Sequence, residues 1–152
     1  ATGHAHSTPL ADVIRSLVVE CSATAQRREQ EVTITRPLPA ALHIPLPEPL
    51  ARVLLRNLLD HAVRYGADRA QLRLQVAQAQ WFTELTVEDS GPGLAPEQQA
   101  RLGERFFRVL GTGQTGSGLG WSIVQRIARI HRLQISTDTS PELGGLRVKV
   151  RW

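Results

Sequence analysis

Several residue types are scarce in this chain of 152 residues. It has one cysteine, Cys21, no methionine, and aromatic residues at 5% of the total. A single cysteine excludes an internal disulfide and a zinc site built on cysteine pairs. No apolar run approaches the roughly 20 residues of a membrane-spanning helix, and the first residues lack the pattern of a signal peptide. We therefore expect a soluble domain from a reducing compartment, with Cys21 in its core.

Lysine is also nearly absent, since Lys149 is the only one. The net charge of +4 and the pI of about 10.5 therefore rest on arginine. Such a balance is typical of nucleic-acid binding, but these arginines are scattered and the few aromatic residues offer no stacking platform. We expect no nucleic-acid partner, because a small polyanionic ligand explains the charge about as well.

The length and the hydrophobic content of 41% are typical of one globular domain. Residues 1–7 show no periodic pattern and are interpreted as a flexible tail or a tag or linker remnant. Residues 8–152 are expected to form the domain. Helical spacing predicts helices at 9–28, 47–65 and 119–130, the first capped by Ser7 or Thr8 and the second closed by Gly66. Alternation predicts strands at 32–35, 41–44, 70–77, 81–88, 133–136 and 146–152.

The helix at 47–65 carries a polar stripe beside its apolar one. Asn57, His61, Arg64 and Tyr65 stand at i, i+4, i+7 and i+8, so they share one face. Asn57 offers a carbonyl oxygen to a hard cation such as Mg²⁺, Tyr65 a ring for a base, and Arg64 a cation for a phosphate. A polar stripe of this kind on a central helix indicates a binding site.

Asp89 stands at the end of a predicted strand, on the same face as Leu85 and Val87. A buried carboxylate is costly unless it is hydrogen-bonded, so we expect it to have a dedicated partner. Within Asp89-Ser-Gly-Pro-Gly93 it could accept a hydrogen bond from an exocyclic amine such as that of adenine. The alternative is an aspartate that only initiates a turn.

A second glycine-rich stretch, Gly116-Ser-Gly-Leu-Gly120, opens the last predicted helix. Glycines let a backbone approach phosphates, and the start of a helix presents free N–H groups and a positive dipole end. No Gly-Lys-Ser/Thr follows, which excludes a Walker loop, and the preceding segment does not fit a Rossmann unit. Tight helix packing is the simpler alternative for these glycines.

Together, these motifs resemble the ATP-binding domain of sensor histidine kinases, within the superfamily of DNA gyrase B subunits, MutL and heat-shock chaperone ATPases. The resemblance covers roughly residues 8–152. Residues 57–65 are similar to the N box of that family, and residues 89–93 to its first glycine box. Residues 104–108 are similar to its F box, and residues 116–124 to its second glycine box. The F box and the short lid disfavour a gyrase- or chaperone-type ATPase.

The resemblance implies an α/β (α+β) two-layer sandwich, in which a mixed, mostly antiparallel sheet packs under three helices. It also implies a mobile lid at about 94–116, which Phe106 and Phe107 anchor. The implied ligands are ATP and Mg²⁺. The implied ATP-binding residues are Asn57, His61, Arg64, Tyr65, Asp89, Gly91, Gly93, Arg108, Gly116, Ser117, Gly118, Leu119 and Gly120.

The same resemblance implies a protein-histidine kinase fragment that supplies the γ-phosphoryl group of ATP to a histidine on a separate helical dimerisation domain. A response regulator would then receive the group. No phosphoacceptor motif occurs in the sequence, so we expect no catalytic residue in this chain and no transfer by it alone. The implied whole protein is a membrane-anchored homodimer with this domain in the cytoplasm, and the fragment itself is expected to be monomeric.

His61 departs from the family pattern, because it replaces the second asparagine of the N box, an expected Mg²⁺ ligand. Imidazole is a poor ligand for Mg²⁺, which prefers oxygen. Three alternatives remain open: His61 points aside while Asn57 and water hold the metal, the site binds nucleotide but transfers phosphate poorly, or it uses a softer metal. The second would make the domain a nucleotide-binding pseudokinase or regulatory module. Trp121 replaces a usual aliphatic residue and is interpreted as packing.

Overall fold

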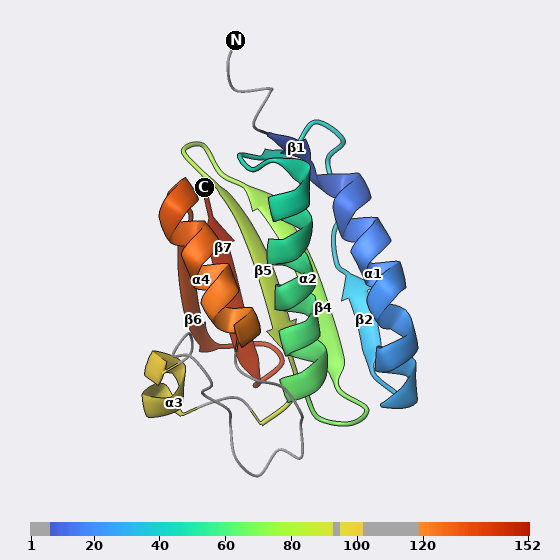
Figure 1. Ribbon diagram of the computed structural model, residues 1–152. Coiled ribbons are helices and arrows are strands. Elements are labelled where there is room, and N and C mark those ends of the chain that lie inside the picture. Colours follow the sequence, from blue (N-terminus) through green and yellow to red (C-terminus); the bar gives the residue numbers. More distant parts are fainter. Residues whose placement is uncertain (1–6, 93–94, 102–118) are drawn as a thin grey trace.

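A computed structural model of the chain describes residues 7–92, 95–101 and 119–152. A five-stranded sheet lies at its centre, and three helices cover one face of that sheet (Figure 1). These helices are α1 (Leu10–Arg27), α2 (Glu48–Tyr65) and α4 (Leu119–His131), with α2 in the middle and in contact with both others. This arrangement confirms the predicted two-layer fold class. No helix in the described part of the chain is long and apolar enough to cross a membrane.

The sheet is mixed, as expected. Its strands lie in the order β2 (Glu31–Ile34), β4 (Gln71–Gln78), β5 (Thr83–Asp89), β7 (Leu146–Arg151) and β6 (Gln134–Thr139). The β2–β4 pair is parallel, and the other three pairs are antiparallel. Two short strands, β1 (Thr8–Pro9) and β3 (His43–Ile44), form a separate pair, and α3 (Pro96–Arg101) is a single short helix.

The core fills the space between the sheet and the helices. Helical spacing directs one stripe of α1, with Val13 and Ile14, and one stripe of α2, with Leu54 and Leu58, into this layer, and all four side chains are buried. Cys21 is also buried, as expected. Because α2 packs against the sheet and against both neighbouring helices, its orientation is the most strongly constrained of the three.

The sheet strands alternate between the core and a polar outer face. In β5, Leu85, Val87 and Asp89 are all buried, as the alternation predicts. Glu84 and Glu88 stand on the opposite face, beside Arg151 and Arg147 of β7 in the register. The sheet is thus apolar toward the helices and charged on its other side.

Three local predictions are wrong. Neither Ser7 nor Thr8 caps α1: Pro9 occupies the N-cap position without a side-chain hydrogen bond, while the Thr8 hydroxyl donates to Leu46 O at 2.7 Å. Tertiary pairing of β1 with β3 takes this residue away from the helix. The strand predicted at 81–88 begins only at Thr83, and Trp81 is 85% exposed in the turn before it. The strand predicted at 41–44 is limited to its last two residues.

Two valines of α1 provide a test of the packing. Val13 is 2% exposed and Val19 is 72% exposed. Val13→Ala removes two buried methyl groups and leaves a cavity, so we expect a loss of about 2 kcal/mol in the free energy of unfolding. Val19→Ala is the matched control, because helix propensity changes equally in the same helix, and it should change stability by less than about 0.5 kcal/mol. Urea denaturation of both variants measures the difference, and equal losses would contradict the predicted buried face.

Candidate functional site

Asn57 lies on the face of α2 that contacts α4. Its Nδ2 donates a hydrogen bond to Val53 O at 2.7 Å. Its Oδ1 is directed at Gly120, where a Cβ atom would lie only 2.7 Å from that oxygen. Glycine at position 120 therefore permits the close approach of the two helices. The polar stripe of α2 and the second glycine motif meet at this point.

His61 lies one turn further along α2 and packs against two aromatic rings. Its ring centroid is 4.6 Å from that of Tyr65 and 5.0 Å from that of Trp121, distances usual for interacting rings. Burial, and to a smaller extent the charge of Arg64, lowers the pKa of His61 to about 4, so the imidazole is neutral at pH 7. Its Nε2 and the Nε1 of Trp121 are buried with no hydrogen-bond partner in the described part of the chain. Together, Tyr65, His61 and Trp121 form a ring cluster between α2 and α4.

Asp89 is 3% exposed at the end of β5. One carboxylate oxygen, Oδ1, accepts hydrogen bonds from the backbone N–H groups of Gly91 at 2.9 Å and Leu146 at 3.3 Å. The other oxygen, Oδ2, accepts none from the described residues. Burial raises the pKa of Asp89, and the two backbone hydrogen bonds oppose that rise. The dedicated partner expected for this carboxylate is therefore main chain, and one oxygen remains available to a hydrogen-bond donor.

The turn after Asp89 lies against the end of α2. A Cβ atom at Gly91 would come within 2.9 Å of Ala67 N and 3.1 Å of Gly66 Cα. The last turn of α2 carries Arg64, which is exposed, and Tyr65, which is partly buried. The end of β5 and the polar stripe of α2 are therefore neighbours, although they lie more than twenty residues apart in the sequence.

Two residues that the sequence patterns did not indicate hold the end of α2. Arg28 Nη1 donates to Val63 O and, at 3.1 Å, to Arg64 O. Gln30 Nε2 donates to Val63 O at 2.9 Å. These donors satisfy carbonyl groups that the end of a helix leaves unpaired, and the positive charge of Arg28 suits the negative end of the helix dipole. No local motif marks them, because their partners are more than thirty residues away.

The structure brings together only part of the predicted site. Asn57, His61, Tyr65 and Gly120 meet between α2 and α4, and Asp89 and Gly91 lie at the end of β5. Leu119 starts α4, and its backbone alone is described. The predicted site and lid residues that lie outside the described residues are Gly93, Phe106, Phe107, Arg108, Gly116, Ser117 and Gly118. Of the predicted lid at about 94–116, only residues 95–101 are described, and α3 falls in that part.

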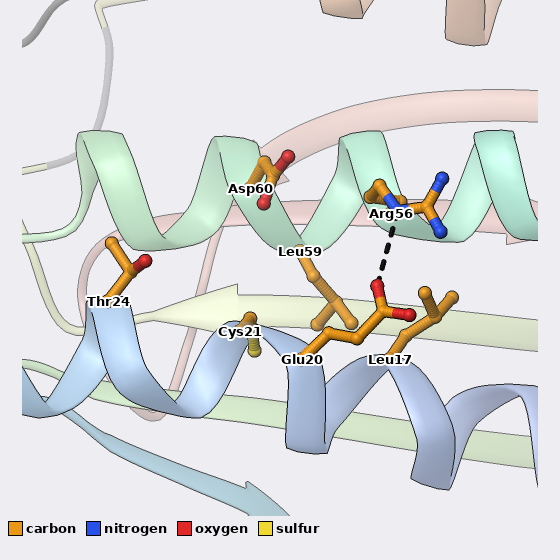
Figure 2. A pocket seen from close by; sticks show the side chains of 7 residues that line it. All are labelled: Leu17, Glu20, Cys21, Thr24, Arg56, Leu59 and Asp60. Atoms are coloured by element: carbon orange, nitrogen blue, oxygen red, sulfur yellow. Dashed lines mark hydrogen bonds and ion pairs between the residues drawn. The ribbon is translucent and has the colours of Figure 1, made fainter.

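A pocket of about 110 Å³ lies elsewhere, between α1 and α2 (Figure 2). The buried Cys21 thiol is on its wall, and the Glu20 carboxylate meets Arg56 across it at 3.3 Å. Burial and the nearby Asp60 carboxylate raise the pKa of Cys21, so the thiol stays protonated and unreactive near neutral pH. The described residues contain no group of three or more His, Cys, Asp or Glu side chains able to hold a metal. This pocket is separate from the site formed by α2, α4 and β5.

Comparison with known proteins shows which family this chain resembles. Residues 47–152 match the family model described as histidine kinase-, DNA gyrase B- and HSP90-like ATPase. Sensor protein QseC of Escherichia coli strain K12 is 40% identical over 144 residues, which cover 95% of this chain and 31% of that protein. The chain thus spans about a third of the length of this curated relative.

Solved structures show the same fold. The mycobacterial sensor histidine kinase MprB superposes with a TM-score of 0.79 at 23% identity, over 96% of this chain and 95% of that one. The cytoplasmic segment of histidine kinase QseC superposes with a TM-score of 0.69 at 28% identity, over 96% of this chain and 76% of that one.

The lowered pKa of His61 predicts a loss of stability in acid. The pKa is about 4 in the folded chain against 6.5 for a free histidine, so the unfolded chain binds this proton more readily. Stability due to neutral His61 is complete above pH 6.5 and falls as the pH drops toward 4, by up to about 3 kcal/mol. Urea denaturation at several pH values between 7 and 4 measures this loss. In His61→Asn, which cannot titrate, the slope in this window should flatten; an unchanged slope would exclude His61 as its source.

Proposed function

Because the chain belongs to the family of histidine kinase-, DNA gyrase B- and HSP90-like ATPases, we propose that it is the ATP-binding domain of a sensor histidine kinase. It binds ATP at the end of β5, beside the last turn of α2 and the first turn of α4. It then presents the γ-phosphoryl group to a histidine on a separate helical domain. The observation that carries this proposal is the half-satisfied, buried carboxylate of Asp89.

Asp89 recognises the adenine base. Its Oδ1 is occupied by two backbone N–H groups, so Oδ2 is the oxygen that accepts a hydrogen bond from the exocyclic amino group. A base with a carbonyl oxygen at that position would place two acceptors against each other in a buried site, which is unfavourable. Tyr65, at the nearby end of α2, packs beside the base, and Arg64 contacts the nucleotide.

The phosphates lie at the start of α4. This 13-residue helix begins at Leu119, and its first N–H groups and positive dipole end favour bound phosphate. Asn57 Oδ1 faces the first turn of the same helix, at Gly120. In this proposal Gly93, Gly116, Ser117 and Gly118 shape the rest of the pocket. Phe106 and Phe107 anchor a lid from which Arg108 reaches the phosphates.

The described residues fit Mg²⁺ at one position and not at the other. Asn57 offers an amide oxygen, and Mg²⁺ in kinases commonly takes one or two protein ligands, with phosphates and water completing its shell. His61 offers only nitrogen, and its ring packs against Tyr65 and Trp121. When bound, Mg²⁺ neutralises phosphate charge. Asn57 would thus hold the metal, while His61 belongs to the ring cluster and serves as packing, which favours the first of the three alternatives for this residue.

The partners follow from the same proposal. The chain contains no recognisable phosphoacceptor histidine, so a helical dimerisation domain of the same protein supplies it, and a response regulator receives the group. The whole protein is a membrane-anchored homodimer with this domain in the cytoplasm. The curated relative is a sensor protein three times as long as this chain, which leaves room for such domains.

Because His61 replaces an asparagine that is an expected Mg²⁺ ligand in the family, a second candidate function is a nucleotide-binding pseudokinase or regulatory module. Mixing the chain with a purified phosphoacceptor domain and labelled ATP separates the two functions. A labelled acceptor supports the kinase, and nucleotide binding without any transfer supports the regulatory module. Label on this chain in the absence of the acceptor domain would contradict both.

Asp89→Asn is predicted to reverse the preference between bases. The amide oxygen must face the N–H groups of Gly91 and Leu146, so the NH₂ group replaces Oδ2 and opposes the amino group of adenine. Affinity for a non-hydrolysable ATP analogue should fall roughly 10- to 100-fold, while the matching inosine analogue, whose carbonyl now faces the NH₂ donor, should bind more tightly than it does to the original chain. Calorimetric titration of both analogues measures the change. An equal loss for the two would mean that Asp89 does not face the base.

His61→Asn tests the metal assignment. If His61 is packing, as proposed, restoring the family residue should leave the Mg²⁺-dependent gain in affinity for the ATP analogue within about 3-fold of the original, since most of the shell is phosphate and water. Titrations with and without Mg²⁺ measure this gain. A tenfold or larger increase, together with faster transfer to the acceptor domain, would instead support the impaired-kinase alternative.

A further inference from the structure

The turn between β6 and β7 packs directly against Asp89. Gly145 N donates to Asp89 O at 3.0 Å, and Leu146 N donates to Asp89 Oδ1 at 3.3 Å. The approach is very close, because a Cβ atom at Gly145 would lie 2.1 Å from Asp89 Oδ1 and 2.3 Å from Asp89 O. Only glycine fits at this position, because a Cβ atom would overlap the main-chain oxygen of Asp89 as well as its side chain.

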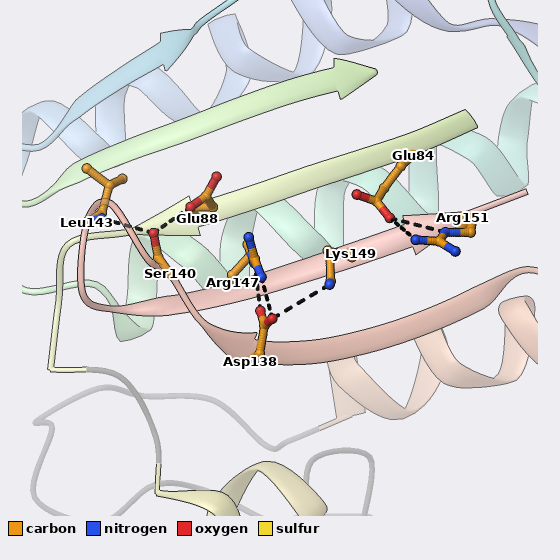
Figure 3. A network of polar contacts seen from close by, with 8 residues as sticks. All are labelled: Glu84, Glu88, Asp138, Ser140, Leu143, Arg147, Lys149 and Arg151. Atoms are coloured by element: carbon orange, nitrogen blue, oxygen red, sulfur yellow. Dashed lines mark hydrogen bonds and ion pairs between the residues drawn. The ribbon is translucent and has the colours of Figure 1, made fainter. Parts of the chain in front are cut away.

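The same turn is fastened to the residue before Asp89 on the opposite face of the sheet. The Ser140 hydroxyl donates to Glu88 Oε2 and accepts a hydrogen bond from Leu143 N at 3.0 Å (Figure 3). Ser140 is 1% exposed and Glu88 is 8% exposed. A buried carboxylate that is hydrogen-bonded to a buried hydroxyl is costly to separate, so this contact resists displacement.

Backbone hydrogen bonds connect the two attachment points. Ser140 N donates to Gly145 O at 2.7 Å, and Gly144 N donates to Ser140 O at 2.9 Å. The hydroxyl that meets Glu88 and the glycine that meets Asp89 therefore belong to one closed turn. Because Glu88 and Asp89 point to opposite faces of β5, this turn holds the strand end from both sides.

We propose that the β6–β7 turn sets the base selectivity of the nucleotide site, with Gly145 and Ser140 as its positioning residues. Leu146 N, directly after the turn, donates to Oδ1 of Asp89, and Gly145 packs against the same oxygen. These contacts fix the plane of the carboxylate and leave Oδ2 directed at the base. Gly145 contacts Asp89 and Ser140 contacts Glu88, so in this proposal both act through the position of Asp89. The inference rests on the proposed recognition of adenine by that carboxylate.

The experiment compares affinities for non-hydrolysable ATP and inosine triphosphate analogues in the original chain and in Gly145→Ala and Ser140→Ala. The added Cβ of Gly145→Ala overlaps both the carboxylate and the main-chain oxygen of Asp89, so the end of β5 and its carboxylate must move, and we expect a tenfold or larger fall in the ATP-to-inosine affinity ratio. Ser140→Ala loosens the turn without a clash, so the ratio should fall about 3-fold. Ser140→Ala also keeps the test decisive if Gly145→Ala does not fold.

Gly144→Asn is the matched control. Gly144 has a φ of +86°, which asparagine tolerates better than most residues, and a Cβ there meets no atom within 4 Å. This variant changes the turn without touching Asp89, so its affinity ratio should equal the original. Thermal unfolding of every variant separates selectivity from stability.

The outcomes distinguish this inference from the proposed function. Lower melting temperatures with an unchanged ratio in both test variants would show that the turn is merely structural, and would overturn the inference while adenine recognition stands. No preference for ATP in the original chain, or no binding of either analogue, would overturn the proposed function and the inference with it. A reduced ratio in Gly145→Ala and Ser140→Ala, but not in Gly144→Asn, supports the inference.

Discussion

A carboxylate buried at the end of a central strand has to be hydrogen-bonded, and the local structure around β5 is organised by that requirement. Asp89 continues the core-facing alternation of Leu85 and Val87, so its carboxyl group enters the interior. Two backbone N–H groups, from the next turn and from the start of β7, meet one of its oxygens. Supplying them requires β5, its following turn and the β6–β7 turn to converge within a few ångströms.

The second constraint is the position of α2 in the middle of the helical layer. One side of α2 packs on the sheet, and the neighbouring helices α1 and α4 flank it. Part of the polar stripe therefore faces a neighbouring helix instead of solvent. Asn57 meets a glycine of α4, and His61 meets a tryptophan of α4. Arg28 and Gln30 then fix the last turn of the helix from outside the site.

His61 and Trp121 both depart from the family pattern, and the two side chains pack against each other. Each is unusual for its motif, and the structure places their rings in contact across the α2–α4 interface. Burial keeps the imidazole neutral, which suits a packed ring and removes the positive charge that would otherwise lie beside Arg64. The contact between the two rings therefore supports a packing role for His61, and in the proposed function Asn57 and Asp89 contact the nucleotide and its metal.

The sequence by itself determined the three covering helices, the core strands and the burial of Asp89, because hydrophobic periodicity records which face of each element is buried. It also placed Asn57, His61 and Tyr65 on one helical face. Only the tertiary structure decided which atoms meet. Thr8 pairs with a strand instead of capping α1, and Arg28 and Gln30 hydrogen-bond to the end of α2. Gly145 and Leu146 donate hydrogen bonds to Asp89. These contacts join residues from about thirty to nearly sixty positions apart, and no local pattern of side chains encodes such pairings, because they depend on how the packed elements bring the chain together.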